Sequence, residues 1–105
     1  MSVTAQQIMQ LNELASEAAT LLSRLANPDR LLILCLLVNG EKNVSQIGEE
    51  SGIVQPTLSQ QLTVLRKDGL VQTRRSGKYV YYRLENPDVL AIMQTLYQVF
   101  CAPQE

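Results

Sequence analysis

The stretch from Gln55 to Leu84 constrains the fold more than any other part of the chain, because a helical pattern, a glycine and two strand patterns follow one another in it. Leu58, Leu62 and Leu65 have the spacing of the buried side of a helix. Pro56 suits the first turn of that helix, and Gly69 suits its end. The sequence therefore predicts a helix over Gln55–Asp68, about four turns long.

Two segments after this helix have strand character. Leu70–Arg74 and Tyr79–Leu84 are rich in β-branched and aromatic residues, which favour strands. Ser76-Gly77 suits a tight connection between them. The sequence therefore predicts a β-hairpin over 70–84, whose tip contains three cations, Arg74, Arg75 and Lys78.

The segment before Gln55 predicts two further helices. Asn27-Pro28-Asp29 has a capping residue, a proline and an acid in the order that opens a helix, which we expect to run to Val38. Ser45 is the expected cap of a short helix over Gln46–Ser51, ended by Gly52. Val54 is a poor cap for the next helix, so other groups must bond its first amides.

These elements together predict a winged helix-turn-helix, in which residues 45–68 form the helix-turn-helix and residues 70–84 form the wing. The fold class is mainly α with a small β-hairpin, in the order α-α-α-α-β-β-α. With 105 residues, the chain should form one domain over 1–105.

The outward side of the predicted Gln55–Asp68 helix is polar. Hydroxyl and amide side chains both donate and accept hydrogen bonds, as base edges in the major groove require. The residues on this side are Thr57, Ser59, Gln60, Thr63 and Lys67. We expect them to contact DNA bases and the hairpin-tip cations to contact phosphates or the minor groove. The alternative is a solvated basic hairpin on an ordinary domain.

The charge distribution supports a DNA-binding segment, although the total does not. The chain has a net charge of −1 and a pI near 5.4. Residues 54–84 nevertheless contain six basic residues and one acidic residue, whereas the segments on either side are acidic. Positive charge is thus concentrated where phosphates would lie.

Both ends of the chain predict amphipathic helices with more apolar surface than a small domain covers. Apolar residues recur at helical spacing in residues 1–26 and again in 87–101. They are Ile8, Leu11, Ala15, Ala18, Leu22 and Leu25, and then Val89, Ile92, Met93, Leu96, Tyr97, Val99 and Phe100. We expect these two helices to form a homodimer on a palindromic operator, the alternative being an ordinary intramolecular core.

Several other classes are disfavoured. The longest apolar run, Leu31–Val38, is too short to span a bilayer, and the N-terminus has no secretion-signal pattern, so we expect a cytoplasmic protein without membrane contact. An enzyme such as a thiol oxidoreductase is disfavoured, because the chain has no Cys-x-x-Cys, no histidine base and no paired carboxylates. We expect no cofactor.

Three segments carry a resemblance to a known family. ANPDRLLILCLLVNGE at Ala26–Glu41, QPTLSQQLTVLRKDGLV at Gln55–Val71 and the following RRSGKYVYYRL resemble the ArsR/SmtB family of winged-helix repressors over nearly the whole chain. The resemblance implies a homodimer that represses an operator until an inducer binds. It implies base contacts at Gln55, Thr57, Ser59 and Gln60, and a wing at Arg75–Lys78. Val54 and Gln61 depart from the family pattern, which commonly has Ser and His there.

The inducer class follows from what the sequence contains. The family's usual inducers are metals, but the chain has no histidine and lacks the expected Cys-x-Cys, since Lys42–Gly48 reads KNVSQIG. We therefore expect no metal site. Cys35 and Cys101 remain as soft groups. Taken alone, Cys35 fits ordinary packing, whereas Cys101 lies just before Ala102-Pro103, near a chain end where exposure is expected.

The cysteine pair resembles that of the persulfide-sensing branch of this family, the BigR and SqrR type repressors. That resemblance implies that sulfane sulfur donors bridge Cys35 and Cys101 and that the bridged repressor leaves its operator. Three alternatives for the same thiols are peroxide, trivalent arsenic and haem. A further alternative is a DNA-binding regulator without a thiol switch.

Overall fold

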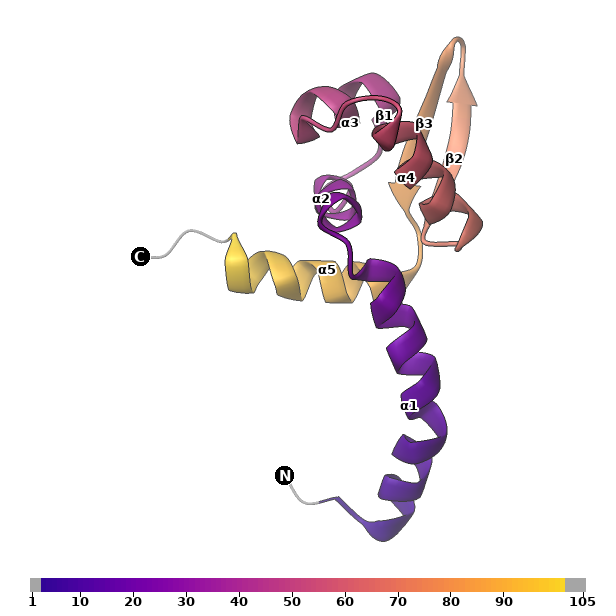
Figure 1. The fold of residues 1–105 in the computed structure, drawn as a ribbon, viewed down its shortest axis with the longest axis vertical. Helices are drawn as coiled ribbons and strands as arrows, with labels where there is room; N and C mark the ends of the chain where they lie inside the picture. Colours follow the sequence, from indigo (N-terminus) through magenta and orange to yellow (C-terminus); the bar gives the residue numbers. More distant parts are fainter. Residues whose placement is uncertain (1–2, 102–105) are drawn as a thin grey trace.

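The computed structural model describes residues 3–101, so Ala102-Pro103, just before which the last helix was predicted to end, and the first two residues of the predicted 1–26 helix lie outside the described residues. Figure 1 shows the arrangement of the elements. In chain order they are α1 Ala5–Leu25, α2 Pro28–Leu36, β1 Lys42–Asn43, α3 Val44–Ser51, α4 Thr57–Lys67, β2 Val71–Ser76, β3 Tyr79–Leu84 and α5 Pro87–Phe100. The predicted winged helix-turn-helix is confirmed, with one additional short strand.

The core is shared by the end of α1, by α2, α3, α4 and α5, and by the inner side of the sheet. Leu58, Leu62 and Leu65 are at most 3% exposed, which confirms the predicted buried side of the α4 helix. The remaining buried apolar residues are Leu25, Ile33, Leu34, Leu37, Ile47, Leu70, Val71, Val89 and Met93. This cluster fixes α4 against the body, so that its opposite side is free to face a ligand.

The helix starts show which capping predictions hold. Asn27 Oδ1 accepts hydrogen bonds from Asp29 N at 3.0 Å and Arg30 N at 3.1 Å, which confirms the predicted start of α2. The α3 helix begins earlier than predicted, at Val44, and is capped by Asn43, not Ser45. The prediction was wrong because Asn43 ends β1 in an extended conformation, from which its side chain reaches Gln46 N at 2.9 Å.

Other boundaries also shift. The α2 helix ends at Leu36 instead of the predicted Val38. The β2 strand continues to Ser76, which pairs with Tyr79, so the turn is Gly77-Lys78 and not Ser76-Gly77. Gly77 has a φ of 60°, which a two-residue hairpin turn requires and glycine adopts without steric cost.

The sheet has a third strand that was not predicted. The β1 strand pairs antiparallel with β3, through Lys42 opposite Tyr82 and Asn43 opposite Tyr81, and gives the strand order β1-β3-β2. Two residues are too short for a strand pattern to be recognised in sequence. Because β1 immediately precedes α3, this pairing connects the wing to the first helix of the helix-turn-helix.

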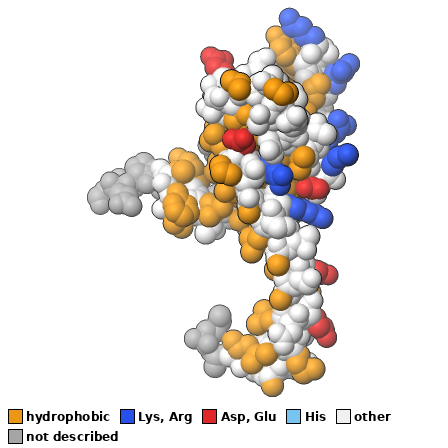
Figure 2. Space-filling model, viewed as in Figure 1, with side chains coloured by type: hydrophobic (Ala, Val, Ile, Leu, Met, Phe, Trp, Pro, Cys, Tyr) orange, Lys and Arg blue, Asp and Glu red, His pale blue; other side chains and the backbone are white. Residues whose placement is uncertain are grey.

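The helices α1 and α5 extend away from this body (Figure 1). Within α1 only Leu25 is buried, and large apolar side chains remain exposed along both helices, as the hydrophobic side chains in Figure 2 show. They include Ile8, Met9, Leu11, Leu14, Leu22, Tyr97, Val99 and Phe100. The dimer remains a prediction, with which these exposed apolar residues agree. Among the helices of residues 3–101, none combines the length and apolarity needed to cross a bilayer.

Candidate nucleic-acid interface and thiol site

The outward side of α4 presents polar side chains, as the sequence predicts. Ser59, Gln60, Thr63 and Lys67 are exposed, and Thr57 is half-buried. The Thr63 hydroxyl donates to Ser59 O at 2.8 Å, which leaves its lone pairs free to accept another hydrogen bond. The Lys and Arg side chains gather over α4 and the hairpin in Figure 2. One side of α4 therefore combines hydrogen-bonding groups with a positively charged surround.

The start of α4 resolves the capping question that Val54 poses. Pro56 occupies the cap position and makes no side-chain capping hydrogen bond. Gln55 Oε1 instead accepts from Ser59 N at 3.0 Å, and Val54 O accepts from Leu58 N at 3.1 Å. Gln55, a predicted base contact, is thus also used to satisfy a first-turn amide of its own helix.

Gln61, the second departure from the family pattern, does not share the outward side of α4. Its side chain is partly buried, and Gln61 Oε1 accepts a hydrogen bond from Arg30 Nε at 2.8 Å. The residue at this position therefore connects α4 to α2. Sequence alone could not assign this role, because the partner lies 31 residues earlier in the chain.

The two faces of the wing separate its three cations. Val71, Tyr82 and Leu84 pack in or against the core, so alternation along the strands places Arg75 on the inner face with Val71. Arg74 then lies on the outer face, opposite Tyr81 in the strand register. Arg75 and Lys78 are exposed near the turn. The three cations predicted at the hairpin tip therefore do not share one face of the sheet, because Arg74 faces away from α4.

Arg74 has an acidic partner that the sequence does not reveal. Its Nε donates to both carboxylate oxygens of Glu41 at 2.9 Å, its Nη2 also bonds Glu41, and its guanidinium carbon lies 4.7 Å from the centre of the Tyr81 ring. The hydrogen bond to Arg74 holds the pKa of the Glu41 carboxyl below its usual range, and the same bond raises the pKa of Arg74. Nothing in the sequence pattern indicates this pair, because Glu41 precedes a strand that is itself too short to be recognised.

The two cysteines lie at the same cavity. Cys35 on α2 and Cys101, which caps the end of α5, line the same cavity of about 300 Å³ together with Leu32, Leu36, Asn39, Lys42, Glu50 and Tyr97. Cys35 is half-buried and Cys101 is exposed. Burial raises the pKa of the Cys35 thiol, and the nearby Cys101 raises it further. Sequence predicted the residues, and tertiary packing supplies their common cavity.

The rim of this cavity also carries an ion pair. Lys42 Nζ, at the start of β1, lies 3.0 Å from Glu50 Oε1 on α3. Both side chains are partly exposed, so the pair contributes little to stability. Within residues 3–101, no group of three or more His, Cys, Asp or Glu side chains could hold a metal ion. The chemistry available in the cavity is therefore that of two thiols beside a cation already paired with a carboxylate.

Known proteins resemble this chain in sequence and in fold. Residues 27–73 match the family described as bacterial regulatory protein, arsR family. The "Biofilm growth-associated repressor" of Xylella fastidiosa is 46% identical over 91 residues, which are 87% of this chain and 80% of that protein. The crystal structure of the transcriptional repressor BigR from Xylella fastidiosa superposes with a TM-score of 0.83 at 44% identity, covering 90% of this chain and 97% of the other.

A second relative, which is named an activator, is also a transcriptional regulator. The "Transcriptional activator HlyU" of Vibrio cholerae is 35% identical over 94 residues, which are 90% of this chain and 87% of that protein. These relatives are transcriptional regulators, not enzymes. Since the identity, the coverage and the winged helix-turn-helix fold agree, the chain belongs to the ArsR family of bacterial DNA-binding regulatory proteins.

Proposed function

We propose that this protein is a cytoplasmic, dimeric transcriptional repressor that senses reactive sulfur species through Cys35 and Cys101 and releases a palindromic operator when the two thiols are bridged. The observation that carries the proposal is the common cavity, which Cys35 and Cys101 both line although 65 residues separate them in the chain. Repression, as opposed to activation, is supported by the name of the 46% identical relative.

The DNA-binding part of the proposal rests on α4 and the wing. We assign base contacts to the outward side of α4 and phosphate contacts to the hairpin turn. The residues are Gln55, Thr57, Ser59, Gln60, Thr63 and Lys67 on or before α4, and Arg75 and Lys78 in the wing. Arg74, which the sequence groups with these contacts, is paired with Glu41 on the outer face of the sheet, so we assign it to positioning the wing.

The dimer is supported by exposed apolar surface on two helices. Leu11 on α1 is 59% exposed and Phe100 on α5 is 79% exposed, which is unfavourable for a protomer alone in water. Burying them against a second copy would place two α4 helices on one operator. Two such helices match two half-sites about one helical turn, roughly 34 Å, apart.

The sulfur chemistry requires only the two thiols and a sulfane sulfur donor. The thiolate of Cys101, the more accessible thiol, attacks the central sulfur of a trisulfide R–S–S–S–R and displaces one RS⁻. Cys35 then attacks the same central sulfur and displaces the second RS⁻. The product is a Cys35–S–S–S–Cys101 bridge, in which the central sulfur comes from the donor, plus two RSH. The protein thiols are thereby oxidised and the donor is reduced.

Such a bridge would act on DNA binding through the elements that carry the thiols. Cys35 lies on α2, which packs against α3, α4 and α5, and Cys101 ends α5. A covalent link between the end of α5 and α2 changes the angle between a dimerisation helix and the reading head, by which we mean the helix-turn-helix and wing of one protomer. Since the two reading heads must match two half-sites at once, a small rotation costs operator affinity.

The experiment follows mass and DNA affinity in the same samples. The operator is first selected from random duplex DNA by the reduced wild-type protein, and the protein is then treated with an inorganic polysulfide or, separately, with hydrogen peroxide. We expect polysulfide to add sulfur between Cys35 and Cys101 and to reduce operator affinity. Unmodified thiols with unchanged affinity would instead make the pair structural.

Matched variants separate the candidate functions. Cys35→Ser and Cys101→Ser should each bind the operator as wild type does and no longer respond to polysulfide. A disulfide without added sulfur, formed only with peroxide, would favour the peroxide sensor. The same affinity assay with arsenite or haem tests the two remaining inducers. Equal behaviour of wild type and both variants under every treatment would leave a regulator without a thiol switch.

A further inference from the structure

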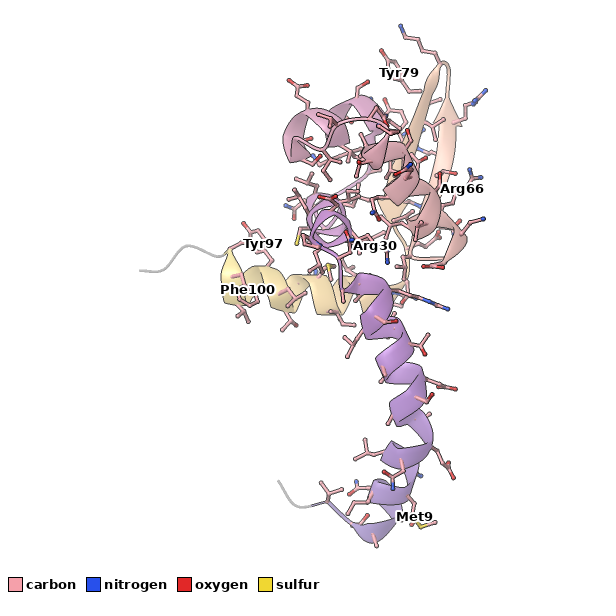
Figure 3. The ribbon with its side chains drawn as sticks, in the orientation of Figure 1. Met9, Arg30, Arg66, Tyr79, Tyr97 and Phe100 are labelled. Atoms are coloured by element: carbon pink, nitrogen blue, oxygen red, sulfur yellow. The ribbon has the colours of Figure 1, made fainter. Side chains whose placement is uncertain are left out.

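Arg30 on α2 connects three helices through its guanidinium. Its Nε donates to Gln61 Oε1 on α4 at 2.8 Å, and its Nη1 donates to Arg24 O near the end of α1 at 3.1 Å. Figure 3 labels Arg30 on α2, beside the end of α1 and next to α4. One side chain therefore bonds the helix that we assign to dimerisation and the helix that we assign to base recognition.

The bond to α1 satisfies a carbonyl that the helix cannot satisfy itself. In a continuing helix, Arg24 O would accept from the N–H of residue 28, but residue 28 is a proline and has no N–H. The Arg30 guanidinium takes the place of that donor, and a cation at a helix C-terminus is favoured by the helix dipole. The contact is thus a consequence of the Asn27-Pro28 connection between α1 and α2.

The bond to α4 uses the inward side of the recognition helix. Gln61 is partly buried, while its neighbour Gln60 is exposed on the outward side. None of the ion pairs within residues 3–101 involves Arg30, so its two bonds go to neutral oxygens on two different helices. The side chains of Arg30 and Gln61 therefore both form contacts between helices.

We infer that Arg30 is a positioning residue, which fixes the angle between α1 and α4 through Arg24 O and Gln61 and thereby sets the distance between the two α4 helices of the dimer. The inference rests on the DNA-binding dimer proposed above and not on the thiol chemistry. It assigns Gln61 a function in operator geometry without any contact to DNA.

The length of α1 makes the angle between α1 and α4 important. The α1 helix has 21 residues and is therefore about 30 Å long. Only its last turns contact the body, through the buried Leu25 and the partly buried Leu21, so few packing contacts hold its direction. A change of about 5° over this length moves the far end by about 3 Å, close to the rise of one base pair.

The experiment measures preference for half-site spacing, which a purely structural role would not change selectively. Operator duplexes selected by wild-type protein are compared with duplexes in which the two half-sites are one base pair further apart. The inserted base pair adds about 3.4 Å and about 35°. The ratio of the two affinities is measured for wild type, Arg30→Met, Gln61→Met and the double variant.

Wild type should prefer the selected spacing, and each single variant should reduce that preference by about twofold to thirtyfold. The double variant should be no worse than Arg30→Met alone, because Arg30→Met already removes the hydrogen bond to Gln61. Gln61→Glu keeps an acceptor for Arg30 and should retain the wild-type ratio, even if its added charge weakens DNA binding overall. Circular dichroism and light scattering check that each variant is folded and dimeric.

Arg24→Met is the matched control, because it removes a cation at the same junction and leaves the backbone carbonyl in place. Its spacing preference should equal that of wild type. The inference is overturned if Gln61→Met keeps the wild-type ratio, or if Arg30→Met weakens both duplexes equally. If the wild-type protein selects no paired half-sites, both the proposed dimeric function and this inference are overturned. If the wild type prefers one spacing and the variants keep the same preference, only the inference is overturned.

Discussion

The Glu41 carboxylate accepts hydrogen bonds from the Arg74 guanidinium across the central strand of the sheet, above the ring of Tyr81. Glu41 precedes β1 on one edge of the sheet, and Arg74 lies on β2 at the other edge. The pair therefore spans all three strands on the face that points away from α4. It ties the projecting hairpin to the segment that follows α2.

We predict that this pair positions the wing and that Arg74 does not bind a phosphate. Glu41→Gln and Arg74→Lys should each weaken operator binding by about twofold to fivefold per reading head, in line with the strength of exposed ion pairs. Arg74→Lys is informative because lysine keeps the charge but cannot form the forked pair of hydrogen bonds. The measurement is fluorescence anisotropy of a labelled operator over a range of salt concentrations.

The salt dependence decides between the two roles of Arg74. Glu41→Gln, Arg74→Lys and Arg74→Gln should leave the slope of log affinity against log salt unchanged, since the number of neutralised phosphates stays the same. A smaller slope in Arg74→Gln, with wild-type binding by Arg74→Lys, would contradict the prediction and return Arg74 to the DNA-binding residues.

Lys78 at the hairpin turn should behave differently from Arg74. It is exposed, and its Nζ lies 5.3 Å from the centre of the Tyr79 ring, so its charge has no carboxylate partner among the ion pairs of residues 3–101. Lys78→Gln should reduce the salt slope by about 0.9 for each phosphate that is no longer neutralised, hence by about 1.8 per dimer. Arg83→Gln, which removes a cation paired with Glu85 at the other end of β3, is the control and should leave the slope unchanged.

The reactivity of Cys35 should show a shifted pH dependence. Burial, and secondarily Cys101, raise the pKa of Cys35, so at a given pH less of it is thiolate than in an unfolded chain. Alkylation of Cys35 by iodoacetamide, followed by mass spectrometry, should therefore reach half its maximal rate at a higher pH in the folded protein than in urea. Cys101→Ser should lower that midpoint partway, because burial is the larger cause. Coinciding midpoints in folded and unfolded protein would contradict this assignment.

The apolar residues of α1 and α5 should determine the oligomeric state. Leu11→Gln and Phe100→Gln each place a polar group where the proposed interface is apolar, and should convert the dimer to monomer at micromolar concentration. Light scattering and the concentration dependence of thermal unfolding measure this. Glu13→Gln, an exposed substitution close to Leu11 on the same helix, should remain dimeric. A wild-type protein that is monomeric at all concentrations would contradict the proposed interface.

Local signals explain why much of the fold was predictable. Asn27-Pro28 and Gly52 mark a helix start and a helix end through backbone chemistry that does not depend on distant residues. The leucine spacing in α4 and the β-branched residues of the hairpin are likewise properties of single segments. The family relationship then agreed with the order of these elements.

The features that the sequence did not predict share a physical cause. The cap of α3 moved from Ser45 to Asn43, and β1 went unpredicted, because a two-residue strand exists only through its pairing with β3. The Glu41–Arg74 pair and the Arg30–Gln61 bond join residues 33 and 31 positions apart. No local pattern contains such partners.

The sequence by itself determined the winged helix-turn-helix, the polar outward side of α4, the concentration of positive charge and the identity of the two thiols, because periodicity, caps and residue chemistry are local. Only the tertiary structure decided that Cys35 and Cys101 share a cavity, that Gln61 turns inward to Arg30, and that Arg74 is held by Glu41. These arrangements depend on how helices and strands pack, and packing places residues side by side that the chain keeps far apart.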